Sequence, residues 1–170
     1  MYPRICDIPK ELEELQGNCG PVSVWMVLQK LGVKASPEEV IRKCEHTLEY
    51  GSFAICMANA LHEFGLNVEF FTDYDAAPKP IEVKGYKKAE DTISVNKAIS
   101  MAKLAKKLNE GKSCIVSYMA RGGEGHFSPV EAVVGNKLIL AYETEHVILK
   151  SEFQYRWRAP EILRQCIFAT

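Results

Sequence analysis

One cysteine of this sequence stands where a buried helix should begin. Cys19 follows Asn18 and precedes Gly20 and Pro21, and an apolar stretch, VSVWMVLQKL, then runs to Gly32. Asn is a favoured N-cap residue, Pro suits a first helical turn, and Gly commonly follows the end of a helix. Free backbone N–H groups at a helix N-terminus stabilise negative charge. Cys19 is therefore placed to act as a thiolate nucleophile. On the cap position alone, one more buried cysteine is an equally good interpretation.

A nucleophile at this position also needs a base, because a helix terminus contributes only about 0.3–1 kcal/mol. We assign this role to His126, which follows a glycine-rich loop over residues 121–125 and opens a segment with strand character. A thiol and an imidazole together can attack a carbonyl carbon and transfer a proton. The helix expected from Asn18 to Leu31 is apolar on nearly all sides, which predicts a buried, central position.

The rest of the pattern places helices before strands. A capping box at residues 36–39 and Ser52 each mark the start of a helix, and residues 67–72 read as a strand. Residues 73–94 hold two prolines, many charges and a short strand-like run at 81–83, so we interpret them as a linker or crossover. The second half predicts a helix over 95–109 capped by Ser94, a strand over 114–120, a hairpin of 126–134 and 137–143, a helix over 151–157 and a strand over 163–169.

These elements predict one α+β domain over residues 1–170. A mainly helical lobe should cover residues 1–72, and a mainly sheet lobe residues 95–170. The sheet half should be antiparallel, and the helix that carries Cys19 should lie centrally between the two halves.

The hairpin gives a prediction of register. Gly135-Asn136 is a two-residue turn signal of type II′ character, so Val134 should face Lys137. Pro129 removes one donor from the ladder, and a bulge there would shift the pairing of all residues before it.

In this register, three polar side chains share a side of the sheet with His126. They are Ser128, Glu143 and Glu145. Glu143 is the diagonal neighbour of His126, at a Cβ separation of roughly 7–8 Å or less, whereas Tyr142 points the other way. We predict that the Glu143 carboxylate orients the imidazole, with Glu145 in its place if the pairing slips.

Composition excludes several classes of function. The chain has 170 residues, 47% of them hydrophobic and 25% charged, and a net charge of −1. Such a charge gives no reason to expect a nucleic acid or an anionic membrane as partner. There is no apolar run of about 20 residues, no secretory signal and no CxxC pair among the six cysteines. We expect a cytoplasmic protein with reduced thiols, without metal or cofactor; the oligomeric state stays open.

Five segments together resemble a known family. CGPVSVWMVLQKLG, GLNVEFF, LAKKLNEGKSCIVSY, GHF and SEFQYRW follow in the order and spacing of the C39-like branch of papain-like cysteine peptidases, and GHFSPV is also similar to a segment of phytochelatin synthases. The resemblance covers almost the whole chain and implies a papain-like fold with Cys19 as nucleophile and His126 as base. It implies a bacterial-type thiol peptidase that cleaves a peptide. Peptidyl transfer through the same acyl-enzyme, and an inactive binding module, remain alternatives.

Two positions depart from the family pattern. The family's oxyanion-stabilising glutamine usually lies about six residues before the cysteine, where this chain has Glu13; Gln16, three residues before Cys19, is our candidate instead. The family's third catalytic residue is usually Asp, and Glu143 occupies that region here. The chain also lacks the transmembrane and nucleotide-binding regions of transporter-linked members, so we expect it to act without a membrane.

Overall fold

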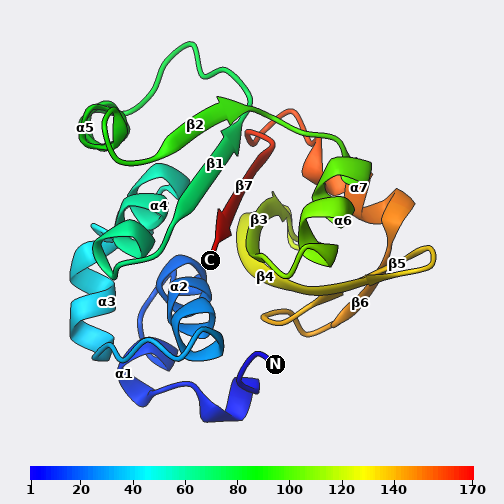
Figure 1. Cartoon of the computed structure of the whole chain (residues 1–170), viewed down its shortest axis with the longest axis horizontal. Coiled ribbons are helices and arrows are strands. Elements are labelled where there is room, and N and C mark those ends of the chain that lie inside the picture. The colour runs from blue at the N-terminus through cyan, green and yellow to red at the C-terminus, as the bar shows by residue number, and fades with distance from the viewer.

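The structure, a computed structural model, describes residues 1–170 and confirms the α+β class. One seven-stranded sheet has the order β2-β1-β7-β3-β4-β5-β6 (Figure 1). Only the β1–β2 pair is parallel. The strands are β1 (Val68–Thr72), β2 (Ser94–Lys97), β3 (Ser113–Met119), β4 (Gly125–Val134), β5 (Lys137–Leu140), β6 (Val147–Leu149) and β7 (Gln165–Ala169).

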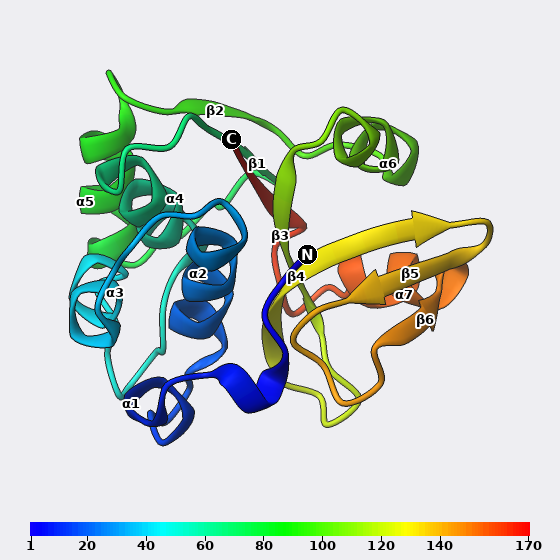
Figure 2. The ribbon, with the colours of Figure 1, turned by 60° about the horizontal axis from the view of Figure 1, so that its bottom comes forward.

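Helices cover both faces of the sheet (Figure 2). On one face, α2 packs on β3 and β4, and α4 packs on β1 and β7; on the other face, α6 and α7 pack on β3 to β6. Two apolar cores follow from this arrangement, one on each face. The helices are α1 (Lys10–Glu13), α2 (Cys19–Lys30), α3 (Pro37–Lys43), α4 (Ala54–Glu63), α5 (Pro80–Ala89), α6 (Met101–Asn109) and α7 (Lys150–Trp157), preceded by a short 3₁₀ helix (Ile5–Asp7).

Helix α2 is the central element that the sequence predicts. Every residue from Gly20 to Leu28 is buried, and α2 begins at Cys19. Gly32 follows the helix with φ +73°, a conformation that favours glycine. Asn18 stands at the N-cap position, but its side chain does not cap the helix; it donates instead to the carbonyls of Leu12 and Glu13.

The segment 73–94 contains a helix, so the short strand expected at 81–83 is wrong. Helix α5 begins at Pro80, where a missing N–H costs nothing. The Glu82 carboxylate accepts the N–H of Lys79 at 2.9 Å and satisfies one further donor of the first turn. These local signals outweigh the prolines and charges that suggested a linker, and α5 is the crossover between the parallel strands β1 and β2.

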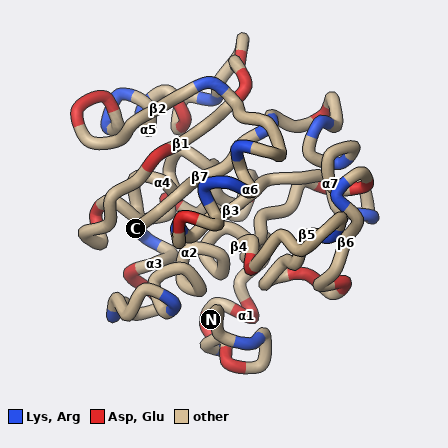
Figure 3. Tube along the Cα trace, turned by 45° about the vertical axis from the view of Figure 1, so that its right-hand side comes forward, with Lys and Arg blue, Asp and Glu red and all other residues tan.

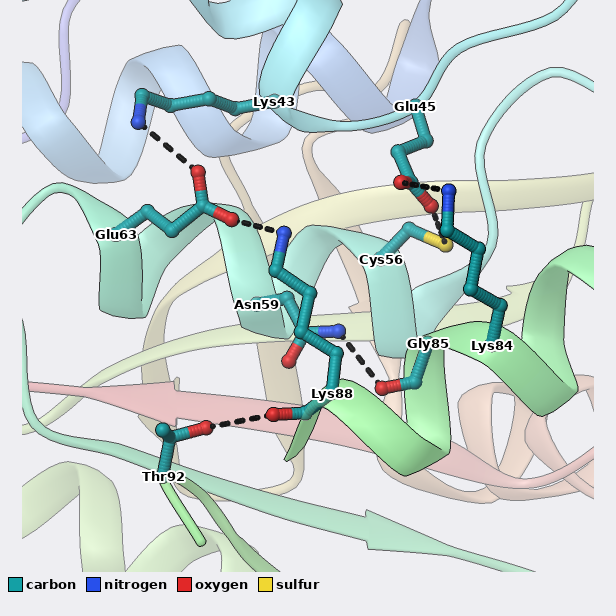
Figure 4. Close-up of polar contacts among 9 residues, drawn as sticks. All are labelled: Lys43, Glu45, Cys56, Asn59, Glu63, Lys84, Gly85, Lys88 and Thr92. Atoms are coloured by element: carbon teal, nitrogen blue, oxygen red, sulfur yellow. Dashed lines mark hydrogen bonds and ion pairs between the residues drawn. The ribbon is translucent and has the colours of Figure 1, made fainter. Parts of the chain in front are cut away.

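Helix α5 packs closely on α4 (Figure 4). A Cβ atom on Gly85 would lie 3.0 Å from Ile55 Cγ2, so glycine is what allows this close approach. The buried Asn59 side chain donates to the Gly85 carbonyl at 2.9 Å. At the edge of the contact, the carboxylate of Glu63 forms ion pairs with Lys43 of α3 and Lys88 of α5.

Serines begin helices at two places, but not at two others that we expected. Ser36 and Ser100 each accept a hydrogen bond from a first-turn N–H, of α3 and α6 respectively. Helix α4 has Phe53 at its N-cap rather than Ser52, whose hydroxyl bonds a histidine ring. Ser94 begins strand β2 and not a helix, because residues 94–97 pair with β1.

Charged residues of both signs are interspersed along the chain trace (Figure 3). No helix combines the length and the apolar character that crossing a membrane requires.

Candidate active site

Cys19 is the first residue of α2 and is half-buried. Neither its backbone N–H nor that of Gly20 finds an acceptor in the protein. Two unpaired donors at a helix start can stabilise negative charge on the sulfur or on a nearby carbonyl oxygen. Gly20 leaves no room for a side chain, because a Cβ atom there would lie 2.8 Å from Ser52 Cβ. The start of α2 is therefore held tightly against the segment before α4.

His126, the second residue of β4, lies between two aromatic rings. Tyr118, opposite it on β3, meets the imidazole edge-on at 5.5 Å between centroids, and Tyr142 stacks on it at 5.7 Å. Nε2 is 2.8 Å from the Tyr142 carbonyl oxygen. Because a carbonyl oxygen only accepts, Nε2 carries the hydrogen in this contact and Nδ1 is left for Cys19.

The pKa of His126 depends on its neighbours, among them Cys19. Burial lowers the pKa of His126, but the Cys19 side chain, the Tyr142 carbonyl and the charge of Glu143 together raise it above its ordinary value. A raised pKa favours the imidazolium beside the sulfur, as a thiolate–imidazolium pair requires. The structure thus brings together two residues that the sequence separates by most of the chain.

The predicted register of the hairpin holds near the turn and fails further along β4. Residues 132–134 pair with 137–139 as expected, and Gly135 has a positive φ. Between Ala132 and Val130 the register shifts, so Val130 pairs with Leu140. The irregularity lies at Glu131, two residues after the proline that we expected to cause it. A shift of one residue changes which side chains face one another.

Glu143 consequently does not contact His126 as predicted. Its carboxylate accepts the Tyr118 hydroxyl at 2.6 Å and the Thr144 N–H at 2.8 Å. Burial raises the pKa of Glu143, but these hydrogen bonds and nearby positive charge lower it overall, so its charge acts on His126 through space. Glu145, the alternative partner, forms an ion pair with Arg121. The predicted carboxylate–imidazole hydrogen bond is wrong.

Tyr142, which we expected to point away, instead makes the contacts nearest the cysteine and the histidine. Its carbonyl binds His126, its N–H donates to Ser128 Oγ at 2.9 Å, and its hydroxyl donates to Asn18 Oδ1 at 3.0 Å. Asn18 immediately precedes Cys19 in the chain. No local sequence signal indicates these contacts, because they form only when the hairpin packs on α2.

The segment before Cys19 is positioned by His46, for which no motif or spacing indicates a role. His46 Nε2 lies 2.9 Å from the Gln16 carbonyl oxygen, and His46 Nδ1 lies 3.1 Å from Ser52 Oγ. The side chains of Gln16 and Glu13 are exposed, and neither hydrogen-bonds another residue. The backbone around Gln16 is therefore fixed, while its amide remains free to meet a substrate.

A cavity of about 430 Å³ opens beside His126, between the two halves of the molecule. A larger cavity, about 870 Å³, lies against α7 and the loop between β3 and β4 and does not include His126; Cys19 lines neither of the two cavities. No three His, Cys, Asp or Glu side chains are grouped as metal ligands. The smaller cavity is the candidate substrate cleft; it is lined by Tyr50, Ser52, Phe53, Ala54, Asp75, Ala77, Lys79, Glu82, Ser117, Tyr118, Gly125, His126, Phe127, Ile162, Leu163 and Gln165.

Comparison with known proteins shows a likeness of structure. No family model and no curated protein matches the sequence. The peptidase domain of Streptococcus ComA, a bi-functional ABC transporter involved in quorum sensing, is similar with a TM-score of 0.61 at 15% identity, over 89% of this chain and 90% of that one.

A double glycine motif protease from an AMS/PCAT transporter, solved in complex with the leader peptide, is similar with a TM-score of 0.60 at 17% identity, over 99% of this chain and 91% of that one. The chain therefore has the fold of these peptidase domains. This agrees with the fold that the resemblance to the C39-like branch implied.

Proposed function

We propose that this protein is a thiol-dependent peptidase that cleaves a peptide bond through an acyl-enzyme. One arrangement carries the proposal: Cys19 begins a buried helix and is near enough to His126 to raise its pKa, while the Tyr142 carbonyl holds His126 Nε2. A nucleophile, a base and a group that orients the base are the parts that such chemistry needs. The fold shared with peptidase domains supports the same reaction class.

The proposed reaction follows from the positions of these groups. The Cys19 thiolate attacks the substrate carbonyl carbon, and the resulting oxyanion meets the free N–H groups of Cys19 and Gly20. His126 gives the proton at Nδ1 to the leaving amine as the C–N bond breaks. Water, deprotonated by the now neutral His126, then attacks the thioester and releases the acid and the thiolate.

We propose Gln16 and Glu143 as supporting residues in this reaction. The Gln16 amide is exposed in the fixed segment before Cys19 and can donate to the oxyanion. Glu143 stabilises the imidazolium by its charge rather than by a direct hydrogen bond. Six free cysteines suit a reducing compartment, which supports a cytoplasmic location.

The substrate that the site favours is a peptide lying in the cavity beside His126. The cavity is open to both halves and holds apolar and polar side chains. One structural neighbour acts at a double glycine motif and was solved with a leader peptide. We propose a glycine-containing cleavage site here by analogy.

Alkylation by iodoacetamide tests the cysteine–histidine pair without knowledge of the substrate. Cys6 is exposed and serves as an internal reference, while four other cysteines are buried. We expect Cys19 to react at least about 10-fold faster than Cys6 near neutral pH, as an activated thiol does, and His126→Ala to remove this advantage. Equal rates at Cys19 and Cys6 in the wild type, measured by mass spectrometry, would indicate an inactive binding module.

Product analysis separates cleavage from transfer. Once a peptide is found that is turned over, the reaction is repeated with a primary amine as competing acceptor. A free carboxylate as the sole product supports a peptidase, whereas a new amide formed in preference to hydrolysis would assign the protein to the acyl transferases.

A further inference from the structure

Tyr142 contacts both His126 and Asn18, the residue before Cys19, and uses a different group for each. Its carbonyl accepts from His126 Nε2 at 2.8 Å, its ring stacks on the imidazole, and its hydroxyl donates to Asn18 Oδ1 at 3.0 Å. We propose that Tyr142 is a positioning residue that sets the geometry between Cys19 and His126. This inference rests on the proposed function, because it concerns the same reacting pair.

The direction of the contact with Asn18 is fixed by the surrounding groups. Asn18 Nδ2 donates to the carbonyl oxygens of Leu12 and Glu13 at 2.9 and 3.1 Å, so the amide oxygen is the end that faces Tyr142. Burial raises the pKa of Tyr142, and its hydroxyl therefore keeps its proton and acts as donor. The hydrogen bond thus connects the chain directly before α2 to the hairpin side of the site.

The backbone of Tyr142 is also held in place by hydrogen bonds. Ser128 is fully buried, and its Oγ accepts the Tyr142 N–H at 2.9 Å while donating to the Pro129 carbonyl at 3.0 Å. These contacts lie beyond the register shift at Glu131, where regular pairing of β4 and β5 has ended. A side chain therefore replaces the missing ladder partner, and it fixes the peptide whose carbonyl meets His126.

Such positioning matters because the two reacting groups come from different halves of the chain. Proton transfer needs heavy atoms within about 2.6–3.2 Å, and a misplacement of about 1 Å can cost about 100-fold in rate. The other groups around the imidazole constrain it without contacting α2: Tyr118 packs edge-on from β3, and the Glu143 carboxylate is bound to the Tyr118 hydroxyl. The charged groups that act on His126 are Cys19 and Glu143. Arg156 acts in turn on Tyr118 and Glu143, and Glu13 acts on Tyr142.

The substitution Tyr142→Phe removes only the hydroxyl and keeps the ring and the carbonyl. We expect the iodoacetamide rate of Cys19 to fall about 10-fold, the value of one hydrogen bond. With a peptide substrate, kcat should fall by a similar factor and KM should stay unchanged. Tyr2→Phe is the matched control: it removes a buried hydroxyl near Lys30, at the other end of α2, and should leave the Cys19 rate unchanged.

A double substitution distinguishes positioning from general packing. Asn18→Ala removes the same contact together with the donations to Leu12 and Glu13, so it should lower the Cys19 rate by at least this factor. Adding Tyr142→Phe to Asn18→Ala should lower the rate no further, because the contact that Tyr142→Phe removes is already absent. Losses that multiply, or a wild-type rate in Tyr142→Phe with only a lower melting temperature, would overturn the inference. Should Tyr142→Phe fail to fold, Asn18→Ala is compared with Asn18→Asp, which loses the same two donations but keeps an acceptor for the Tyr142 hydroxyl. A slower Cys19 rate in Asn18→Ala than in Asn18→Asp supports the inference, and an equal or faster rate contradicts it.

The same measurements separate this inference from the proposed function. A wild type in which Cys19 shows no His126-dependent advantage over Cys6 refutes the proposed function and the inference with it. A wild type that shows the advantage, combined with an unchanged rate in Tyr142→Phe, refutes the inference alone.

Discussion

The two sides of the candidate active site are specified over very different distances in the chain. On the nucleophile side, one buried helix places Cys19, and its bounds follow from residues within the helix and next to it, such as Pro21 and Gly32. On the base side, His126 lies at the opposite end of β4 from the turn. Its partners depend on a register that shifts by one residue at Glu131.

The difference shows which features can be predicted from neighbouring residues and which cannot. A helix start depends on a few adjacent residues, each with its own preference. The register at one end of a hairpin depends on every residue between that end and the turn. One bulged residue therefore changes which side chains face each other beyond it. The start of the helix that carries Cys19 is therefore predictable from sequence, whereas the contacts of His126 are decided by packing.

Removing either reacting side chain should have the largest effect. Cys19→Ala and His126→Ala should each lower kcat/KM by at least about 1,000-fold. When two residues act as a unit, removing either one abolishes almost all of the rate enhancement that the pair provides. The variant carrying both changes should be no worse than either alone. Peptide turnover measures this, and urea unfolding checks that each variant is folded. Losses that multiply would mean that the two sides act independently.

Gly20→Ala tests how tightly the nucleophile side is packed. The new Cβ would lie 2.8 Å from Ser52 Cβ and 3.2 Å from Met57 Sδ, so we expect a loss of about 2–3 kcal/mol in unfolding free energy. Gly125→Ala is the control on the base side, because its Cβ would meet only Ile162 Cγ2 at an ordinary 3.6 Å. Urea denaturation measures both, and an equal cost at the two glycines would contradict the close packing of α2.

Serine-to-alanine substitutions at two buried positions, one on each side of the site, compare how much a hydroxyl contributes to stability there. Ser128 Oγ has two hydrogen-bond partners, whereas Ser23 Oγ in α2 has none. Ser128→Ala leaves the Tyr142 N–H without its partner and should cost about 1–2 kcal/mol. Ser23→Ala should change unfolding free energy by less than about 0.5 kcal/mol. Equal costs in denaturant titrations would show that the contact at Ser128 does not support the hairpin.

Glu143→Gln should have the smallest effect on turnover, a few-fold at neutral pH, because the carboxylate has no hydrogen bond to His126. Its charge does raise the pKa of His126. Without that charge the imidazolium loses its proton at lower pH, so the alkaline limb of the pH profile of peptide turnover, which needs an imidazolium to protonate the leaving amine, should move to lower pH. A loss of turnover as large as that of His126→Ala would instead support the direct hydrogen bond between Glu143 and His126 that the register predicts.

The fold could be predicted from sequence wherever an element carries its own signals. The central helix, the strand over 113–119 and the turn at Gly135 are of this kind. Helix α5 was missed because its charges and prolines hid a capping arrangement and a glycine that serves packing on α4. Strand β2 is exposed along its whole length, so no apolar alternation marks it, and it exists because β1 is beside it.

The sequence carries signals for the proposed reacting pair of the candidate site but none for its supporting contacts. Cys19 and His126 each have a local signal, and Cys19 is among the groups that raise the pKa of His126. The hydrogen bonds from His46 to Gln16 and from Tyr142 to Asn18 join residues far apart in the chain. Their side chains are ordinary in type and spacing, so only the packed structure reveals them.

The position of β7 in the sheet has a consequence for how the molecule is made. This strand, Gln165–Ala169, lies between β1 and β3 and is the only strand that pairs with both. During synthesis, Cys19 and His126 leave the ribosome before the residues that close the sheet between β1 and β3. The newborn chain therefore carries both reactive side chains before its sheet is continuous, and the sheet is completed only when β7 has emerged.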